Sequence, residues 1–214
     1  MNQWEFRWHE GRVGFHLKEV NSYLIRHSEQ LLKRDINKIF VPLCGKSLDL
    51  YWLAERIKKV VGVELVRKPV EDFFKENNIN FSTKLLEEFE LFQSDFIEIF
   101  NGDFFALNES MTGQFDAIYD RASIVAIDAP ERLKYANHLM RFLTDDGMIL
   151  LITLEYDQNQ MLGPPFSVPF SEIIRLFSNQ GNLEILETCD ILDDRLRGKG
   201  LSKILERVIK ITKL

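Results

Sequence analysis

Short apolar runs alternate with segments of helical apolar spacing along most of this chain. Runs with the length and β-branched content of buried strands are "KIFVPL" (38–43), "VVGVEL" (60–65), "FDAIYD" (115–120) and "GMILLITLEY" (147–156). Segments with helical spacing or helix-start signals are 16–34, 47–57, 68–78, 130–144 and 171–179. Strands that alternate with helices predict a mostly parallel sheet with helices on both faces.

Two regions depart from this alternation. Residues 81–101 predict a short hairpin that leads into a third buried strand. The last two apolar runs, "LEILETCDIL" and "KILERVIKITK", have no helix between them, so they predict an antiparallel pair at one edge of the sheet. The pattern as a whole indicates a doubly wound α/β fold, in which ligands bind beyond the carboxyl ends of the strands.

Composition narrows the class of protein. The 214 residues are 45% hydrophobic and contain no repeat or linker, which predicts a single domain over 1–214, with 1–34 as an N-terminal extension. A net charge of −6 argues against nucleic acid as a partner. With two cysteines, no signal-peptide core and no run long enough to span a bilayer, we expect a cytoplasmic protein that contacts no membrane and is a monomer.

The loop "FVPLCGKSLDL" (40–50) contains the Gly-Lys-Ser with which a phosphate-binding P-loop ends. A P-loop also needs a glycine five positions before Gly45 and successive backbone amides that wrap the phosphates. Position 40 is Phe40, and Pro42 has no amide to donate. The sequence therefore predicts that this loop holds no phosphate and that Lys46 and Ser47 begin the next helix.

The same loop nevertheless lies in a nucleotide-type context. A strand enters a glycine turn and then a helix, and Glu64 ends the next strand about 20 residues later, where an acidic group bonds ribose hydroxyls. One glycine lets a ligand approach the backbone but does not wrap a pyrophosphate, which favours a nucleoside such as S-adenosylmethionine. An equally consistent interpretation is that Gly45 only ends a strand and Glu64 is solvated.

Two further strand ends carry polar groups. Asp103 and Phe104 follow the third strand, where the carboxylate suits an adenine amino group and the ring suits adenine stacking. Asp120 and Arg121 end the fourth strand, although an ordinary ion pair between the two is an alternative. Carboxylates at three successive strand ends favour a binding site there.

Together these segments resemble the thiopurine S-methyltransferases, most closely the bacterial members. The resemblance rests on "WEFRWHEGRVGFHLKEVNSYL", "FVPLCGKSLDL", "VVGVEL", "VEDFF", "GDFFAL", "YDRAS" and "DQNQMLGPPFSVP", and it runs from about Trp4 to the C-terminus. It implies a methyltransferase of class I with a Rossmann-like, seven-stranded sheet that uses S-adenosylmethionine. It is weakest at 79–95 and 190–203.

The resemblance also implies roles for individual residues. Positions matching cofactor contacts are Trp8, Leu43, Gly45, Glu64, Asp103, Phe104 and Arg121. Positions on the methyl-acceptor side are Phe15, Pro165 and Phe166, the last two within a lid-like segment from Gly163 to Phe166. The N-terminal extension over 1–34 is also expected to cover the active site. Arg121 is expected to be catalytic by lowering the pKa of the acceptor thiol. Asp120 is either a general base or a group that holds Arg121.

Several interpretations remain open at this stage. The leading one is methyl transfer to the sulfur of thiopurines or other small aromatic thiols. Methylation of selenium or tellurium species is a close alternative, and a non-catalytic nucleoside-binding domain is a distant one. The absent G-x-G-x-x-G argues against an NAD-dependent oxidoreductase. The four histidines and two cysteines lack metal-ligand spacing, and Cys44 is interpreted as a packing residue.

Overall fold

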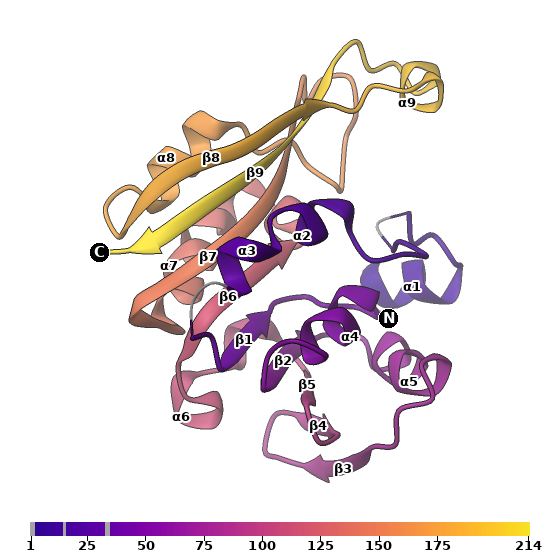
Figure 1. The fold of residues 1–214 in the computed structure, drawn as a ribbon. Helices are drawn as coiled ribbons and strands as arrows, with labels where there is room; N and C mark the ends of the chain where they lie inside the picture. The colour runs from indigo at the N-terminus through magenta and orange to yellow at the C-terminus, as the bar shows by residue number, and fades with distance from the viewer. Residues whose placement is uncertain (1–2, 15, 33–34) are drawn as a thin grey trace. The chain divides into compact units, whose positions relative to one another are not determined.

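A computed structural model describes residues 3–14, 16–32 and 35–214. The chain divides into two compact units, Met1–Gly113 and Gln114–Leu214, which are coloured indigo to magenta and magenta to yellow in Figure 1. The prediction of a single domain over 1–214 therefore stays a prediction.

The first unit begins with three short helices, α1 (Gln3–His9), α2 (Ser22–Arg26) and α3 (Ser28–Leu32). The prediction of one helix over 16–34 was wrong. Helix α2 starts only after Asn21, because the side-chain oxygen of Asn21 accepts hydrogen bonds from the amides of Tyr23 and Leu24 and so caps the helix. The extension is joined to the rest of the unit through Asp49, whose buried carboxylate accepts the Asn21 amide at 2.8 Å.

The remaining elements of the first unit follow the predicted alternation. They are β1 (Lys38–Val41), α4 (Leu48–Ala54), β2 (Lys59–Glu64), α5 (Arg67–Glu76), β3 (Ser82–Leu85), β4 (Glu90–Gln93), β5 (Ile97–Asn101), η1 (Phe104–Ala106) and α6 (Glu109–Thr112). Their strand order is β3-β4-β5-β2-β1, in which β1, β2 and β5 are parallel and the β3–β4 hairpin is antiparallel. Helices α4 and α5 contact β2 and β5.

Helix α5 illustrates how this unit is held together. Pro69 lies in its first turn, as predicted, and Val70, Phe73 and Phe74 are fully buried. Phe74 packs against Phe92 of β4 at a ring-centroid distance of 6.4 Å. Burial of each such side chain is worth about 1.5–3 kcal/mol, so this face fixes the helix on the sheet.

The second unit contains the C-terminal half of the sheet elements. They are β6 (Phe115–Arg121), η2 (Ile124–Ala126), η3 (Ala129–Glu131), α7 (Arg132–Arg141), β7 (Leu143–Tyr156), α8 (Phe170–Phe177), β8 (Gly181–Asp190), α9 (Asp194–Gly198) and β9 (Ile204–Lys213). Strand β6 pairs parallel with β7, and β9 pairs antiparallel with both β7 and β8. The predicted antiparallel pair at the end of the chain is thereby confirmed.

The fold class is confirmed as α/β with parallel strands and an antiparallel edge, but the strand number was wrong. The described residues form nine strands where seven were expected. The two additional strands are β3 and β4, the hairpin that the sequence predicted, because β4 pairs with β5 and so continues the sheet. All four side chains of β3 are exposed, which leaves it the least buried strand of its unit.

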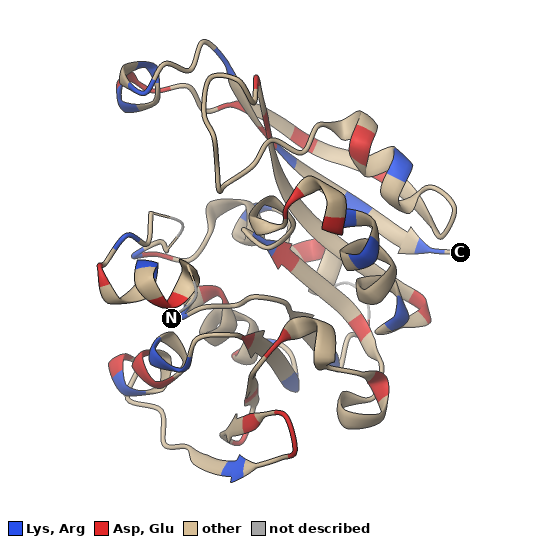
Figure 2. Ribbon diagram, turned by 180° about the vertical axis from the view of Figure 1, so that it is seen from behind, with Lys and Arg blue, Asp and Glu red and all other residues tan. Residues whose placement is uncertain are grey.

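Charges are mixed along both units. Figure 2 shows Lys and Arg interspersed with Asp and Glu. Helix α5, for example, has ion pairs between Arg67 and Glu71 and between Lys68 and Asp72. In the described part of the chain, no helix combines the length and the apolar character needed to cross a bilayer.

Candidate functional site

The turn after β1 has an unusual backbone. Leu43 has φ of 46° and Gly45 has φ of 53°, both in the left-handed region. Glycine adopts this conformation readily, but a leucine in it costs on the order of 1–3 kcal/mol. The amide of Cys44 donates to the Val63 carbonyl at 3.0 Å, which ties the turn to β2. Strain of this kind is concentrated at ligand-binding sites, so Leu43 supports a binding role for the turn.

Glu64 closes this turn from the end of β2. Its carboxylate is buried and accepts the Gly45 amide at 2.9 Å through Oε2 and the Val66 amide at 2.8 Å through Oε1. Burial raises the pKa of Glu64 to about 7, although the amides of Val66, Gly45 and Leu65 oppose that rise. The amides of Gly45, Val66 and Leu65 leave part of the carboxylate's acceptor capacity for the hydroxyl groups of a ribose.

Trp8 of α1 lies on the same turn. Its side chain is buried, and a Cβ added at Gly45 would stand 2.9 Å from Trp8 Cζ2. Glycine is therefore needed at position 45 both for its φ angle and for the approach of the indole. The structure brings together Trp8, Leu43, Gly45 and Glu64, four of the residues predicted to contact the cofactor.

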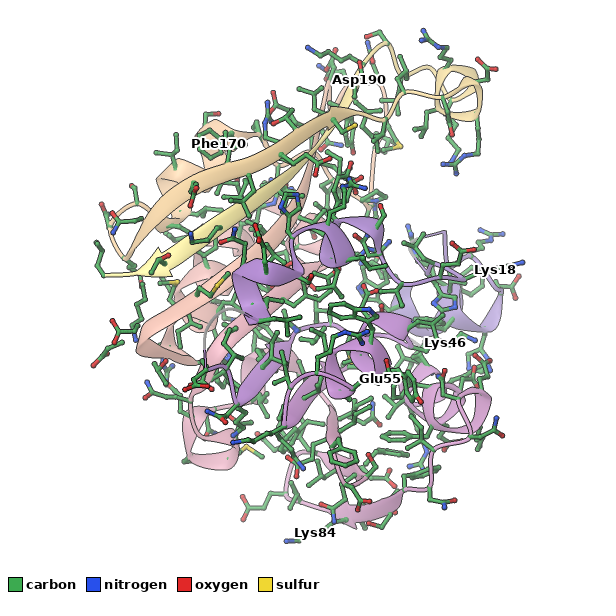
Figure 3. All side chains as sticks on the ribbon, in the orientation of Figure 1. Lys18, Lys46, Glu55, Lys84, Phe170 and Asp190 are labelled. Carbon is green, nitrogen blue, oxygen red and sulfur yellow. The ribbon has the colours of Figure 1, made fainter. Side chains whose placement is uncertain are left out.

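Lys46 and Ser47 follow the turn and serve the helices of the unit. Ser47 caps α4, since its hydroxyl accepts the Asp49 amide at 3.2 Å, which confirms the predicted helix start. Lys46, labelled in Figure 3, bonds both carboxylate oxygens of Glu76 at 2.6 and 2.8 Å. These contacts give both residues a place in the fold that needs no phosphate.

Cys44 is buried beneath the turn. A Cβ at Gly62 of β2 would lie 2.7 Å from its sulfur, so the glycine makes room for the thiol. Burial and the nearby charge of Glu64 raise the pKa of Cys44 well above its usual value. The thiol therefore stays protonated at neutral pH, which agrees with its interpretation as a packing residue.

Asp103 and Phe104 follow β5, whose end is joined to that of β2. The Gly102 amide donates to the Glu64 carbonyl at 3.0 Å. Asp103 is exposed and accepts the Phe105 amide through Oδ1 at 2.9 Å. Phe104 is buried and stacks on Phe40, with ring centroids 6.3 Å apart. Their role toward adenine stays a prediction.

In the second unit, Asp120 is fully buried near the end of β6. Its Oδ2 accepts the phenol of Tyr135 at 2.8 Å, and its Oδ1 accepts the Ile124 amide at 3.2 Å. Burial raises the pKa of Asp120 to about 6, opposed by Tyr135 and by groups of Ile124 and Ser123. The hydrogen bond to Ile124 closes the turn that follows the strand.

Arg121 ends β6 and is half-buried. The next residue, Ala122, has φ of 64° and, like Leu43 after β1, is a left-handed non-glycine residue in the turn that follows a strand. The turn that carries Arg121 is thus fixed on one side by the strand and on the other by the bond from Ile124 to Asp120. Its catalytic role stays a prediction.

The segment from Gly163 to Val168 is hydrogen-bonded along its length within the second unit. The Phe166 amide donates to the Val125 carbonyl at 2.7 Å, and the phenol of Tyr156 donates to the Pro165 carbonyl at 2.6 Å. The Val168 carbonyl accepts the hydroxyl of Thr153 at 3.0 Å. Pro165 and Phe166 are half-buried. These bonds hold the segment to η2 and β7, and its role as a lid over the acceptor pocket stays a prediction.

Phe15 lies outside the described residues, so its predicted contact with the acceptor stays a prediction. Sequence reasoning missed Ala122, Arg132 and Tyr135, which shape the turn after β6 and its surroundings. No local pattern identifies them, because Tyr135 and Arg132 act on residues distant in the chain. In the ranges the structure describes, no three His, Cys, Asp or Glu side chains gather as metal ligands.

Comparisons with known proteins agree with this geometry. The profile of the family described as Thiopurine S-methyltransferase matches residues 1–214. The Thiopurine S-methyltransferase of Pseudomonas fluorescens (strain SBW25) is 42% identical over 210 residues, which cover 97% of this chain and 96% of that protein. The corresponding protein of Nitrosospira multiformis is 40% identical over 207 residues, covering 96% and 94%.

A solved structure supports the fold. The SAM-dependent methyltransferase of Anabaena variabilis superimposes with a TM-score of 0.67 at 16% identity, covering 99% of this chain and 93% of that one. The family profile and the curated relatives each extend over nearly the whole sequence. This chain therefore belongs to the thiopurine S-methyltransferase family.

Proposed function

We propose that this chain transfers a methyl group from S-adenosylmethionine to the sulfur of thiopurines or other small aromatic thiols. The observation that carries the proposal is the bond between the Glu64 carboxylate and the Gly45 amide, in a chain that matches the family over residues 1–214. That bond joins the first two strand ends into a turn suited to a nucleoside, and the family supplies the reaction.

The residues of the first unit fit the methyl donor. Glu64 offers buried acceptor oxygens to the ribose hydroxyls, beside the left-handed turn from Leu43 to Gly45. Trp8 contributes an aromatic surface, which attracts a cationic sulfur. Asp103 has an exposed carboxylate for the adenine amino group, with Phe104 beside it.

S-adenosylmethionine supplies a methyl group on a positively charged sulfur, which a nucleophile attacks in line. No acyl or phosphoryl intermediate forms, so the main task of the protein is to align the acceptor and exclude water. Arg121 stabilises the acceptor as a thiolate by its positive charge. Pro165 and Phe166 form part of the acceptor surface.

A dedicated general base is unnecessary for an aromatic thiol, which is already acidic. Asp120 has the raised pKa of a base, but its oxygens are engaged by Tyr135 and Ile124. We therefore assign Asp120 to holding the turn that carries Arg121. Within this proposal the protein is a cytoplasmic monomer that acts on small molecules and binds no nucleic acid, in keeping with its net charge of −6 and two cysteines.

Calorimetry tests the donor site. S-adenosylmethionine and its demethylated product, S-adenosylhomocysteine, are expected to bind the wild-type protein, and NAD is not. Binding of NAD alone would sink the proposal.

A turnover assay tests the acceptor. The enzyme is incubated with S-adenosylmethionine and a panel of 6-thiopurine, thiophenol, selenite and tellurite. Methylated thiol is the expected product. Turnover of selenite or tellurite alone would replace the sulfur acceptor by a metalloid, and binding without any turnover would indicate a nucleoside-binding protein.

A further inference from the structure

Arg132 is a buried cation that the proposed mechanism does not use. It is the first residue of α7 and is only 3% exposed. Its charge is matched by Glu172 near the start of α8, with Nη1 and Oε2 2.7 Å apart. A buried ion pair of this kind is weak evidence for stability alone, because desolvation offsets much of the attraction.

The other hydrogen bonds of Arg132 join two loops. Nε donates to the Ile127 carbonyl at 3.0 Å, just after η2, and Nη1 donates to the Ser167 carbonyl at 3.1 Å. The guanidinium carbon also lies 5.9 Å from the centroid of the Phe166 ring. One side chain thus connects the loop after η2 with the segment that carries the predicted acceptor contacts.

The planar fork of arginine is needed for this arrangement. Donors from two nitrogens reach the carbonyls and the carboxylate together, and a lysine ammonium, a compact point charge, does not reproduce that geometry. Lysine does keep the charge beside Glu172. Arg132→Lys therefore keeps a positive charge beside Glu172 but removes the hydrogen bonds that connect the two loops.

We propose that Arg132 is a positioning residue for the methyl acceptor, because it holds the backbone of Ser167 and the ring of Phe166 in a fixed place. This inference rests on the proposed function, which assigns Pro165 and Phe166 to the acceptor surface. Displacement of such a surface removes contacts with the bound acceptor, and lost acceptor binding raises the KM. Binding of the donor by the residues of the first unit is not expected to change.

The chain offers a matched control. Arg175 of α8 bonds the other oxygen of the same carboxylate, with Nη2 and Glu172 Oε1 3.2 Å apart, and its side chain is 63% exposed. Arg175→Lys alters the same ion-pair network at its exposed end. Both variants are compared with the wild type for kcat and KM with 6-thiopurine, for S-adenosylhomocysteine affinity and for Tm.

We expect Arg132→Lys to raise the KM for 6-thiopurine about tenfold or more, in line with lost acceptor contacts, while S-adenosylhomocysteine affinity stays within about twofold. Arg175→Lys should change neither. An Arg132→Lys enzyme with normal acceptor KM and a lowered Tm would overturn the inference and leave Arg132 with a purely structural role. Absence of thiol turnover by the wild type would instead overturn the proposed function.

Phe166→Leu keeps the inference testable if Arg132→Lys does not fold. It should raise the acceptor KM without changing S-adenosylhomocysteine affinity, and an unchanged acceptor KM would overturn the inference. Where all variants fold, the double variant should raise the KM by less than the two single effects combined, because both changes act on the same segment. Additive effects would contradict that route.

Discussion

Glu64 and Asp120 are two buried carboxylates at the ends of strands, one in each unit, and they differ in what surrounds them. Burial raises the pKa of both, to about 7 for Glu64 and about 6 for Asp120. Glu64 accepts hydrogen bonds from backbone amides alone. Asp120 accepts one from the phenol of Tyr135, a side chain fixed on α7 and itself fully buried.

The difference indicates how a buried acid is assigned to a ligand or to the fold. Backbone amides hold Glu64 in place while leaving acceptor capacity toward a ligand. Around Asp120, side-chain and backbone donors of Tyr135, Ser123 and Ile124 fill that capacity. A raised pKa is common to both acids, so it does not distinguish a binding group from a structural one.

Asp120→Ala tests the structural role of Asp120 and should have the largest effect of the variants considered. It leaves the buried phenol of Tyr135 and the Ile124 amide without their acceptor, and we expect a loss of about 3 kcal/mol in the free energy of unfolding. Urea denaturation measures it. Asp145→Ala, which removes an exposed carboxylate of the same unit, is the control and should have almost no effect. Unchanged stability in Asp120→Ala would show that the hydrogen-bond network is unimportant.

Glu64→Ala should weaken S-adenosylhomocysteine binding by about 2 kcal/mol, or roughly thirtyfold, because charged hydrogen bonds to the ribose are lost. Calorimetry measures the affinity. Glu76→Ala removes a carboxylate that bonds Lys46 beside the same turn and serves as the control, with affinity expected to stay the same. Equal affinities of wild type and Glu64→Ala would move Glu64 out of the site.

The pH dependence of S-adenosylhomocysteine affinity should distinguish the two acids. Where Glu64 titrates, the affinity should change by about tenfold per pH unit. The ionised form of Glu64 accepts ribose hydroxyls best, so S-adenosylhomocysteine affinity should be full above its pKa of about 7 and fall as the pH drops below it. Calorimetry between pH 5.5 and 8.5, a range chosen to bracket that pKa, measures the slope. Glu64→Gln should flatten it and Asp120→Asn should not. The opposite pattern would exchange the roles of the two residues.

Tyr135→Phe should give the smallest effect, a loss of about 1 kcal/mol in the free energy of unfolding. The variant removes one donor, while Asp120 keeps its bond from Ile124. Urea denaturation again measures it, with Tyr51→Phe at an exposed position as control. A loss as large as that of Asp120→Ala would mean that the phenol alone sustains the turn.

The sequence predicted well where the cause is local. The predicted strand ends gave the positions of Glu64, Asp103 and Asp120 in the fold. The serine cap gave the start of α4. Phe40 and Pro42 exclude a P-loop by their residue types alone. These inferences succeed because periodicity, capping and loop chemistry act over a few residues.

Prediction failed where the cause is a distant partner or a backbone detail. The residues around Tyr135 in the sequence do not indicate its hydrogen bond to Asp120, which lies fifteen positions away. The start of α2 depends on the side chain of Asn21, which a wider apolar pattern concealed. The left-handed φ angles of Leu43 and Ala122 could not be predicted from the residue types, because both residues disfavour them.

The protonated state of Cys44 has a consequence for its reactivity toward a methyl donor. A methyl donor is an alkylating reagent, and Cys44 is a buried thiol in the turn that we propose to bind it. Burial and the charge of Glu64 keep that sulfur as a thiol, a poor nucleophile compared with a thiolate. The same carboxylate proposed to bind the donor thereby protects the protein from its own reagent.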